Sequence, residues 1–162
     1  MDSKNLKGLF LILVIVGAAA GFIHLYGMTS TAYAIDQVSN SGSVKSISIL
    51  RERDPDQAFL IVQLENPTNL DVKIGFDESY AVTLDSFTAT GLLSGSREEA
   101  IEPHGSIEFQ MIATLSEGWT ATDDNLTITV AGELEISTTS LWVQKTRTRE
   151  LDFTDYYEIF ES

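Results

Sequence analysis

Closely spaced acidic residues are the clearest candidates for chemistry in this sequence. Three of the pairs are Asp54 with Asp56, Glu98 with Glu99, and Asp123 with Asp124. Carboxylate oxygens suit Ca²⁺, but a calcium loop supplies six or more oxygens and usually contains a Gly. None of the pairs stands in such a loop. We therefore interpret them as solvated loop charge and predict neither a metal nor another cofactor. If one pair did bind a metal, Asp123 and Asp124 would be the best candidates.

Residues suited to nucleophilic or acid–base catalysis are few. The chain has no cysteine, which excludes a thiol nucleophile, a thiolate zinc site and a disulfide framework. Its two histidines are His24, inside an apolar run, and His104, in a Pro-His-Gly turn. A histidine-based triad or metal site would depend on His104 alone. We predict no catalytic residues and a protein that is not an enzyme.

The Asn66-Pro67 dipeptide separates two runs of alternating apolar residues. Pro67 cannot donate a hydrogen bond to a β-ladder, and it restricts Asn66 to extended geometry. Asn side chains bond to nearby backbone groups in turns. We therefore interpret Asn66 and Pro67 as a structural corner between two strands.

Three other side chains are candidates for binding or modification. Asn125 begins an Asn-Leu-Thr glycosylation sequon. Trp119 and Trp142 are possible ligand platforms, but aromatic residues of a β-sandwich usually pack in the core. We predict that Trp142 is buried on one face of a strand and that Trp119, which follows a Gly in a loop, is the more exposed.

The first structural element in the chain is an apolar segment over residues 9–26. It has about 18 residues without a formal charge, close to the ~20 that a membrane-spanning helix needs. Lys4 and Lys7 precede it, and the next basic residue is Lys45. The positive-inside rule then places residues 1–8 in the cytoplasm and the rest of the chain outside. We predict a single-pass protein of the cell membrane, with His24 near the outer surface of the bilayer.

Two alternatives to a retained anchor remain open. The Ala32-Tyr33-Ala34 triplet has the form of a signal-peptidase site, and cleavage near Ala34 would release a secreted protein. However, the triplet lies far beyond the apolar run, and that run is longer than a typical signal sequence. Lys7-Gly8 resembles the processing site of type IV pilin precursors, which would start the mature chain at Leu9 and make it a filament subunit. We favour the retained anchor.

The outer part of the chain is acidic and has the periodicity of β-strands. The formal net charge of −14 repels phosphate backbones, so we predict no binding of nucleic acid. Residues 27–43 are rich in Ser, Thr, Gly and Asn, which is typical of a linker. Residues 44–154 alternate with period two between turn residues. The expected strands cover residues 44–50, 59–64, 70–76, 80–85, 87–95, 106–115, 126–136 and 141–153.

This strand pattern predicts an all-β protein, an antiparallel sandwich of the fibronectin or immunoglobulin type preceded by one transmembrane helix. Four segments also resemble the water-stress-and-hypersensitive-response domain of late-embryogenesis-abundant proteins. They are VQLENPTNLDVKIGFDESYAVTLD, FTATGLLSG, IEPHGSIEFQMIATL and LTITVAGELEI. The resemblance covers about residues 44–153 and implies a fibronectin-like sandwich, an association with water stress and no catalytic residues to carry over. One departure is Thr68, where the family often has Asn.

The last residues, 155–162, form an acidic tail with four large apolar side chains. We predict that this tail folds back onto the sandwich, because a solvated tail rarely carries so many apolar groups. The alternative is a docking motif for a protein partner, formed by Tyr156, Tyr157 and Phe160. Together these features predict a non-enzymatic envelope protein whose β-sandwich binds or scaffolds surface components, as an accessory subunit of a membrane complex or in stress protection.

Overall fold

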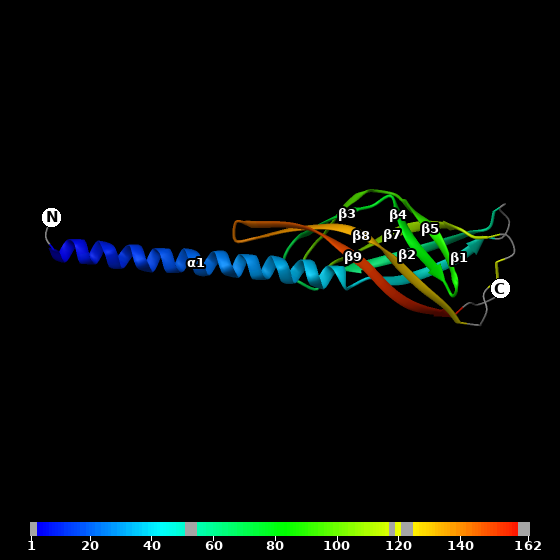
Figure 1. Ribbon diagram of the computed structural model, residues 1–162, viewed down its shortest axis with the longest axis horizontal. Helices are drawn as coiled ribbons and strands as arrows, with labels where there is room; N and C mark the ends of the chain where they lie inside the picture. Colours follow the sequence, from blue (N-terminus) through cyan, green and yellow to red (C-terminus); the bar gives the residue numbers. More distant parts are fainter. Residues whose placement is uncertain (1–2, 51–54, 117–118, 121–124, 159–162) are drawn as a thin grey trace.

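The structure, a computed structural model, describes residues 3–50, 55–116, 119–120 and 125–158. Within these residues one helix and nine strands are formed (Figure 1). They are α1 (Ser3–Ser39), β1 (Ser43–Leu50), β2 (Gln57–Glu65), β3 (Val72–Phe76), β4 (Ser79–Leu84), β5 (Phe87–Ser94), β6 (Glu98–Ile101), β7 (Ser106–Thr114), β8 (Asn125–Ser140) and β9 (Val143–Glu158). The predicted class, an antiparallel β-sandwich behind one N-terminal apolar helix, is confirmed.

The strands form one continuous antiparallel sheet that folds over on itself. Its order is β1-β2-β7-β5-β4-β8-β3-β6, and β9 pairs with the other edge of β8. The sixteen-residue β8 pairs with β4 over residues 128–131 and with β3 over residues 134–138. The β1 and β9 edges meet where the Val44 N–H donates to the Asp155 carboxylate at 3.0 Å. The curled sheet therefore encloses a core between its two layers.

The side chains of that core come from apolar residues at every second position of the strands. In β2 the apolar residues Leu60 and Val62 are fully buried, and they pair with Met111 and Phe109 of β7. The opposite layer contributes alternating buried residues of β4 and β8, such as Val82, which pairs with Val130. Because successive side chains of a strand point to opposite faces, period-two sequences bury one face and leave the other to water.

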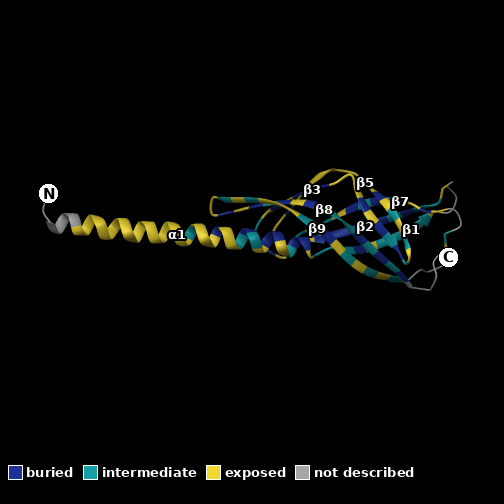
Figure 2. Ribbon diagram, in the orientation of Figure 1, coloured by how far each residue is buried: buried dark blue, intermediate teal, exposed yellow. Residues whose placement is uncertain are grey.

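The helix α1 continues well beyond the predicted membrane segment, so the predicted linker over residues 27–43 is wrong. α1 ends at Ser39, and from Gly27 onward its buried residues recur at helical spacing (Figure 2). Thr31, Ala34, Ile35 and Val38 are fully buried. The Thr31 hydroxyl donates to the Gly27 carbonyl at 2.9 Å, so this polar side chain is satisfied inside the helix. Residues 27–39 have the composition of a linker, but packing against the sheet stabilises them as a helix.

Three strands differ from the sequence-based expectation. β6 was not predicted, and β8 extends four residues beyond the predicted end at Ile136, to Ser140. β9 begins at Val143, two residues after the predicted start, and continues to Glu158. The first residues of the predicted C-terminal tail therefore belong to a strand that pairs with β8.

Candidate functional site

The second half of α1 packs against β8 and β9 along a seam formed by small and polar residues. The Ser30 hydroxyl donates to the Ser140 hydroxyl at 2.8 Å, and the Arg149 guanidinium lies 3.9 Å from the Asp36 carboxylate. A Cβ at Gly27 would lie 2.8 Å from both the Ser140 carbonyl oxygen and the Val143 Cγ2 atom. Only glycine allows the helix to approach the hairpin this closely.

The β8–β9 hairpin extends along α1 toward the N-terminus of the chain (Figure 1). Its tip is a two-residue turn, because Ser140 pairs with Val143 across Leu141 and Trp142. Both turn residues have positive φ, 45° for Leu141 and 68° for Trp142. This combination defines a type I′ turn, which strongly prefers Asn-Gly. A left-handed conformation costs an ordinary L-residue roughly 1–2 kcal/mol.

The two other non-glycine residues with positive φ in the described chain have side chains that tolerate it. They are Asp85, with φ of 53°, and His104, with φ of 57°. Asp and His are enriched in the left-handed region, whereas bulky apolar residues are rare there. Leu141 and Trp142 therefore occupy the turn against their conformational preference.

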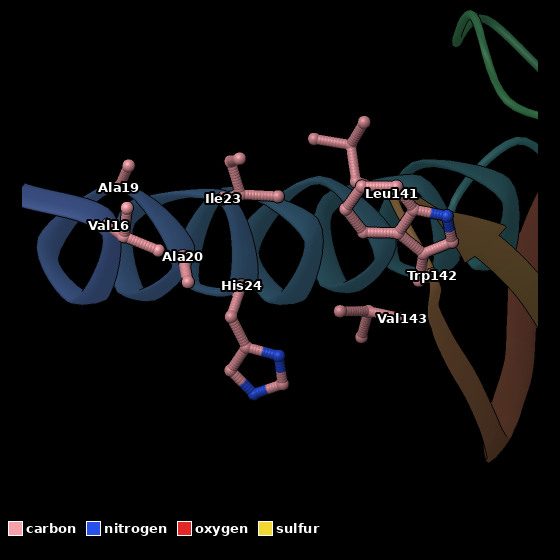
Figure 3. A pocket seen from close by; sticks show the side chains of 8 residues that line it. All are labelled: Val16, Ala19, Ala20, Ile23, His24, Leu141, Trp142 and Val143. Atoms are coloured by element: carbon pink, nitrogen blue, oxygen red, sulfur yellow. The ribbon is translucent and has the colours of Figure 1, made fainter. Parts of the chain in front are cut away.

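An apolar groove of about 440 Å³ lies between this tip and α1 (Figure 3). Its lining residues are Val16, Ala19, Ala20, Ile23, His24, Leu141, Trp142 and Val143. Trp142 is 88% exposed and Leu141 is 47% exposed. The prediction that Trp142 is buried is wrong, because β8 and β9 extend past the rest of the sheet and their turn has no second layer above it. Trp119, expected to be the more exposed, is half-buried and packs against the core.

A stripe of basic residues follows the tip on β9. Lys145, Arg147 and Arg149 alternate along the strand, so they share one face. Residues 136–149 contain these three basic residues and no acidic residue, in a chain with a net charge of −14. The hairpin is thus apolar at its tip and positively charged behind it.

Sequence reasoning missed this tip, although a signal was present. Two long alternating runs flank Leu141 and Trp142, and a two-residue gap between such runs is the usual mark of a hairpin. The apolar character of both gap residues concealed the turn. Sequence reasoning also missed Gly17 and Gly21, four residues apart in the apolar half of α1, where an added Cβ would meet nothing within 4 Å.

The Asn66 side chain, at the predicted corner, connects the β2–β3 loop to the β6–β7 loop through hydrogen bonds. Asn66 is fully buried and lies between β2 and β3. Its side-chain amide donates to the carbonyl oxygens of Leu70 at 2.7 Å, Ile101 at 3.2 Å and Glu102 at 3.1 Å. Its side-chain oxygen accepts from the Thr68 N–H at 3.2 Å and the Thr68 hydroxyl at 2.7 Å. The Asn66 side chain is therefore engaged entirely in internal hydrogen bonds.

The other predicted site residues are not brought together. His104 is exposed, and its Nε2 atom lies 2.7 Å from the Asn69 side-chain oxygen. Glu98 and Glu99 are exposed on β6, an edge strand, where charge discourages pairing with another chain. Within the described part of the chain, no three His, Asp or Glu residues lie close enough to hold a metal. Asp54, Asp123, Asp124, Phe160 and the Asn125 side chain lie outside the described residues.

The two described tyrosines of the predicted docking motif differ in their environments. Tyr157 packs against the core, and its hydroxyl donates to the Lys45 carbonyl at 3.5 Å. Tyr156 is 75% exposed. The pair is split because successive residues of β9 face opposite sides. Tyr156 is the one whose ring is free to contact a partner.

Tyr80 is a buried titratable residue whose hydroxyl group is hydrogen-bonded within the fold. Its hydroxyl accepts from the Asp77 N–H at 3.1 Å and donates to the Glu133 carbonyl at 3.2 Å. Burial raises the pKa of Tyr80 to about 12. A Cβ at Gly132 would overlap the Tyr80 ring. Through these hydrogen bonds Tyr80 holds the β3–β4 connection against β8.

Comparison with known proteins adds little to this geometry. No protein-family model and no curated protein matches the chain. Among solved structures, the crystal structure of a FixG-related protein from Vibrio parahaemolyticus aligns with 69% of this chain and 95% of its own, at 11% identity and a TM-score of 0.28. A similarity this low supports no functional conclusion.

Proposed function

We propose that this chain is a non-enzymatic, single-pass envelope protein that holds its acidic β-sandwich at a fixed height outside the membrane, where the domain binds or scaffolds another surface component. One observation carries the proposal. α1 passes without a break from an exposed apolar half, long and apolar enough to cross a membrane, into the seam with β8 and β9. A helix joined in this way positions its domain, whereas a flexible linker would only retain it near the membrane.

The seam also bears on how the N-terminus is processed. Cleavage after Ala34 would remove Gly27, Ser30 and Thr31 from the seam and would leave the mature chain starting at the buried Ile35. Processing after Gly8 would leave every contact of the seam intact. The packing therefore supports a retained helix over a chain released near Ala34, and the two lysines before the apolar run support a cytoplasmic N-terminus.

A filament subunit is the second candidate, and the open surface around Gly17 and Gly21 favours it. Small residues four positions apart allow two apolar helices to pack closely. In a filament, the apolar halves of α1 from neighbouring copies would form the core and the sandwiches would lie outside. A protective role under water stress, suggested by the resemblance described above, remains a prediction.

Two measurements together separate these possibilities: mass spectrometry of the native N-terminus and sedimentation of membranes after an alkaline wash. The proposal expects a chain that starts at Met1 or Asp2 and stays with the membrane pellet. A chain that starts at Leu9 and sediments as a polymer after detergent has removed the lipid would establish the filament subunit instead. A soluble chain starting at Ile35 would rule out both.

A further inference from the structure

We propose that the tip of the β8–β9 hairpin, Leu141 and Trp142, inserts into the outer leaflet of the membrane beside α1, as a second membrane contact of the same chain. The insertion presupposes the membrane span of α1 proposed above. Lipid is the occupant that fits the exposed tip and the apolar groove, whose walls are formed by the hairpin and by the membrane segment itself.

The depth of the tip follows from the length of the helix. The hydrocarbon core of a bilayer is about 30 Å thick, and a helix rises 1.5 Å per residue. The distance from Lys7 to Tyr26 is then about 29 Å, which matches the core, whereas Lys7 to Ala19 covers only about 18 Å. The groove runs along residues 16–24 of α1, and the tip stands at its outer end, just past His24, where Val143 packs against Gly27 (Figure 3). A bilayer that covers the apolar segment therefore also reaches the tip.

The chemistry of the tip suits that depth. Trp prefers the membrane interface, where its ring is in apolar surroundings and its N–H remains near water. Two large apolar side chains are retained in a turn that prefers Asn-Gly, and such strain tends to persist at functional positions. In water most of the Trp142 side chain and about half of the Leu141 side chain would remain exposed.

The charge behind the tip is complementary to lipid headgroups. Lys145 follows Val143 by two residues, or about 7 Å along a strand, and Arg147 lies about 7 Å further. When Trp142 is at the interface, Lys145 is level with the headgroups and Arg147 stands just outside them, and a positive charge near this surface is attracted to anionic lipid. The rest of the outer domain is strongly acidic, so this stripe is the part of its surface that suits such a membrane.

Tryptophan fluorescence of the full chain in lipid vesicles tests the insertion, because Trp119 and Trp142 are the only tryptophans. Replacing Trp119 by Phe leaves Trp142 as the single reporter. We expect phospholipids with brominated acyl chains to quench Trp142 strongly and aqueous iodide to quench it weakly. The matched variant Trp142→Phe reports on Trp119, which follows β7 and packs against the core of the domain, and brominated lipid should leave it largely unquenched.

A third reporter distinguishes failure of the insertion from failure of the membrane span. Phe22→Trp, in a chain without the native tryptophans, reports on the apolar half of α1. Quenching of this reporter by brominated lipid without quenching of Trp142 would overturn the insertion alone. If neither reporter is quenched, the membrane span itself fails. Cross-linking of hairpin tips between copies, with Trp142 inaccessible to lipid, would assign the tip to self-association and overturn the insertion.

Two test variants and one control connect the quenching of Trp142 to the proposed contacts, and all of their substitutions are at surface positions. Leu141→Asn suits the type I′ turn and makes the tip less apolar, so quenching of Trp142 should fall. Leu92→Asn, at an exposed apolar residue of β5, is the control and should leave it unchanged. Replacing Lys145 and Arg147 by Gln should weaken the quenching in vesicles with anionic lipid and not in neutral ones. Equal quenching in both would overturn the headgroup contact.

Discussion

The hydroxyl of Ser30 donates a hydrogen bond to the hydroxyl of Ser140 at 2.8 Å, across 110 residues of sequence. This contact joins the helix to the hairpin at the end of β8, directly behind the tip. The two segments that we propose to meet the membrane, the apolar half of α1 and the Leu141-Trp142 turn, are therefore held in one arrangement by the seam between them.

Gly27→Ala should weaken that seam. The added methyl group would meet the Ser140 carbonyl and the Val143 side chain at 2.8 Å. Overpacking of this kind costs about 1–3 kcal/mol, which exceeds the gain in helix propensity of about 1 kcal/mol. We expect a lower thermal midpoint for the full chain in detergent. Gly21→Ala, at an open position of the same helix, is the control and should leave the midpoint unchanged or slightly higher.

Asn66→Ala should destabilise the domain more than a typical turn substitution. It would remove three hydrogen bonds to backbone carbonyls and the acceptor of the Thr68 N–H and hydroxyl, and of these carbonyls the Glu102 oxygen would still accept from the Gly105 N–H. Unsatisfied buried polar groups cost about 1–3 kcal/mol each, so we expect a total loss on the order of 3 kcal/mol in chemical unfolding. Asn69→Ala, which removes only an exposed contact to His104, should cost much less. Equal losses would show that the corner does not depend on Asn66.

Tyr80 should make stability sensitive to alkaline pH. Its folded pKa of about 12 lies above the ordinary value of 10.0, because burial favours the neutral phenol. The corresponding stabilisation is complete below pH 10 and is lost as the pH rises from 10 to 12. Tyr80→Phe should reduce that loss, while costing about 1 kcal/mol at neutral pH through its hydrogen bonds. Unfolding curves at several pH values test this, with the exposed Tyr156→Phe as the control.

Tyr157→Ala and Tyr156→Ala should separate packing from docking at the C-terminal strand. Tyr157 packs against the core, so its truncation should lower the thermal midpoint, with a cost of about 2–4 kcal/mol for a large apolar side chain. Tyr156 is mostly exposed, so its truncation should leave the midpoint unchanged. Loss of a co-purifying protein with Tyr156→Ala alone would identify this side chain as a docking residue. A lower midpoint with Tyr156→Ala would contradict its exposed position.

Much of the architecture could be predicted because it depends on local pattern. Alternation with period two predicts the strands of the core, since neighbouring side chains of a strand face opposite sides. Pro67 marks the end of β2 for an equally local reason, because it has no N–H to donate. The hydrogen bonds of Asn66 to Ile101 and Glu102 could not be predicted in the same way, because those carbonyls are more than thirty residues away.

The sequence by itself determined most of the core strands, the corner and the apolar helix, because each follows from short-range periodicity and composition. It did not determine that residues 27–39 continue that helix, since their Ser, Thr and Gly residues suit a linker until a sheet is available to pack against. It also did not determine the position of Trp142. An apolar residue beside a strand is buried only if a second layer covers it, and the tertiary arrangement extends this hairpin beyond the sheet.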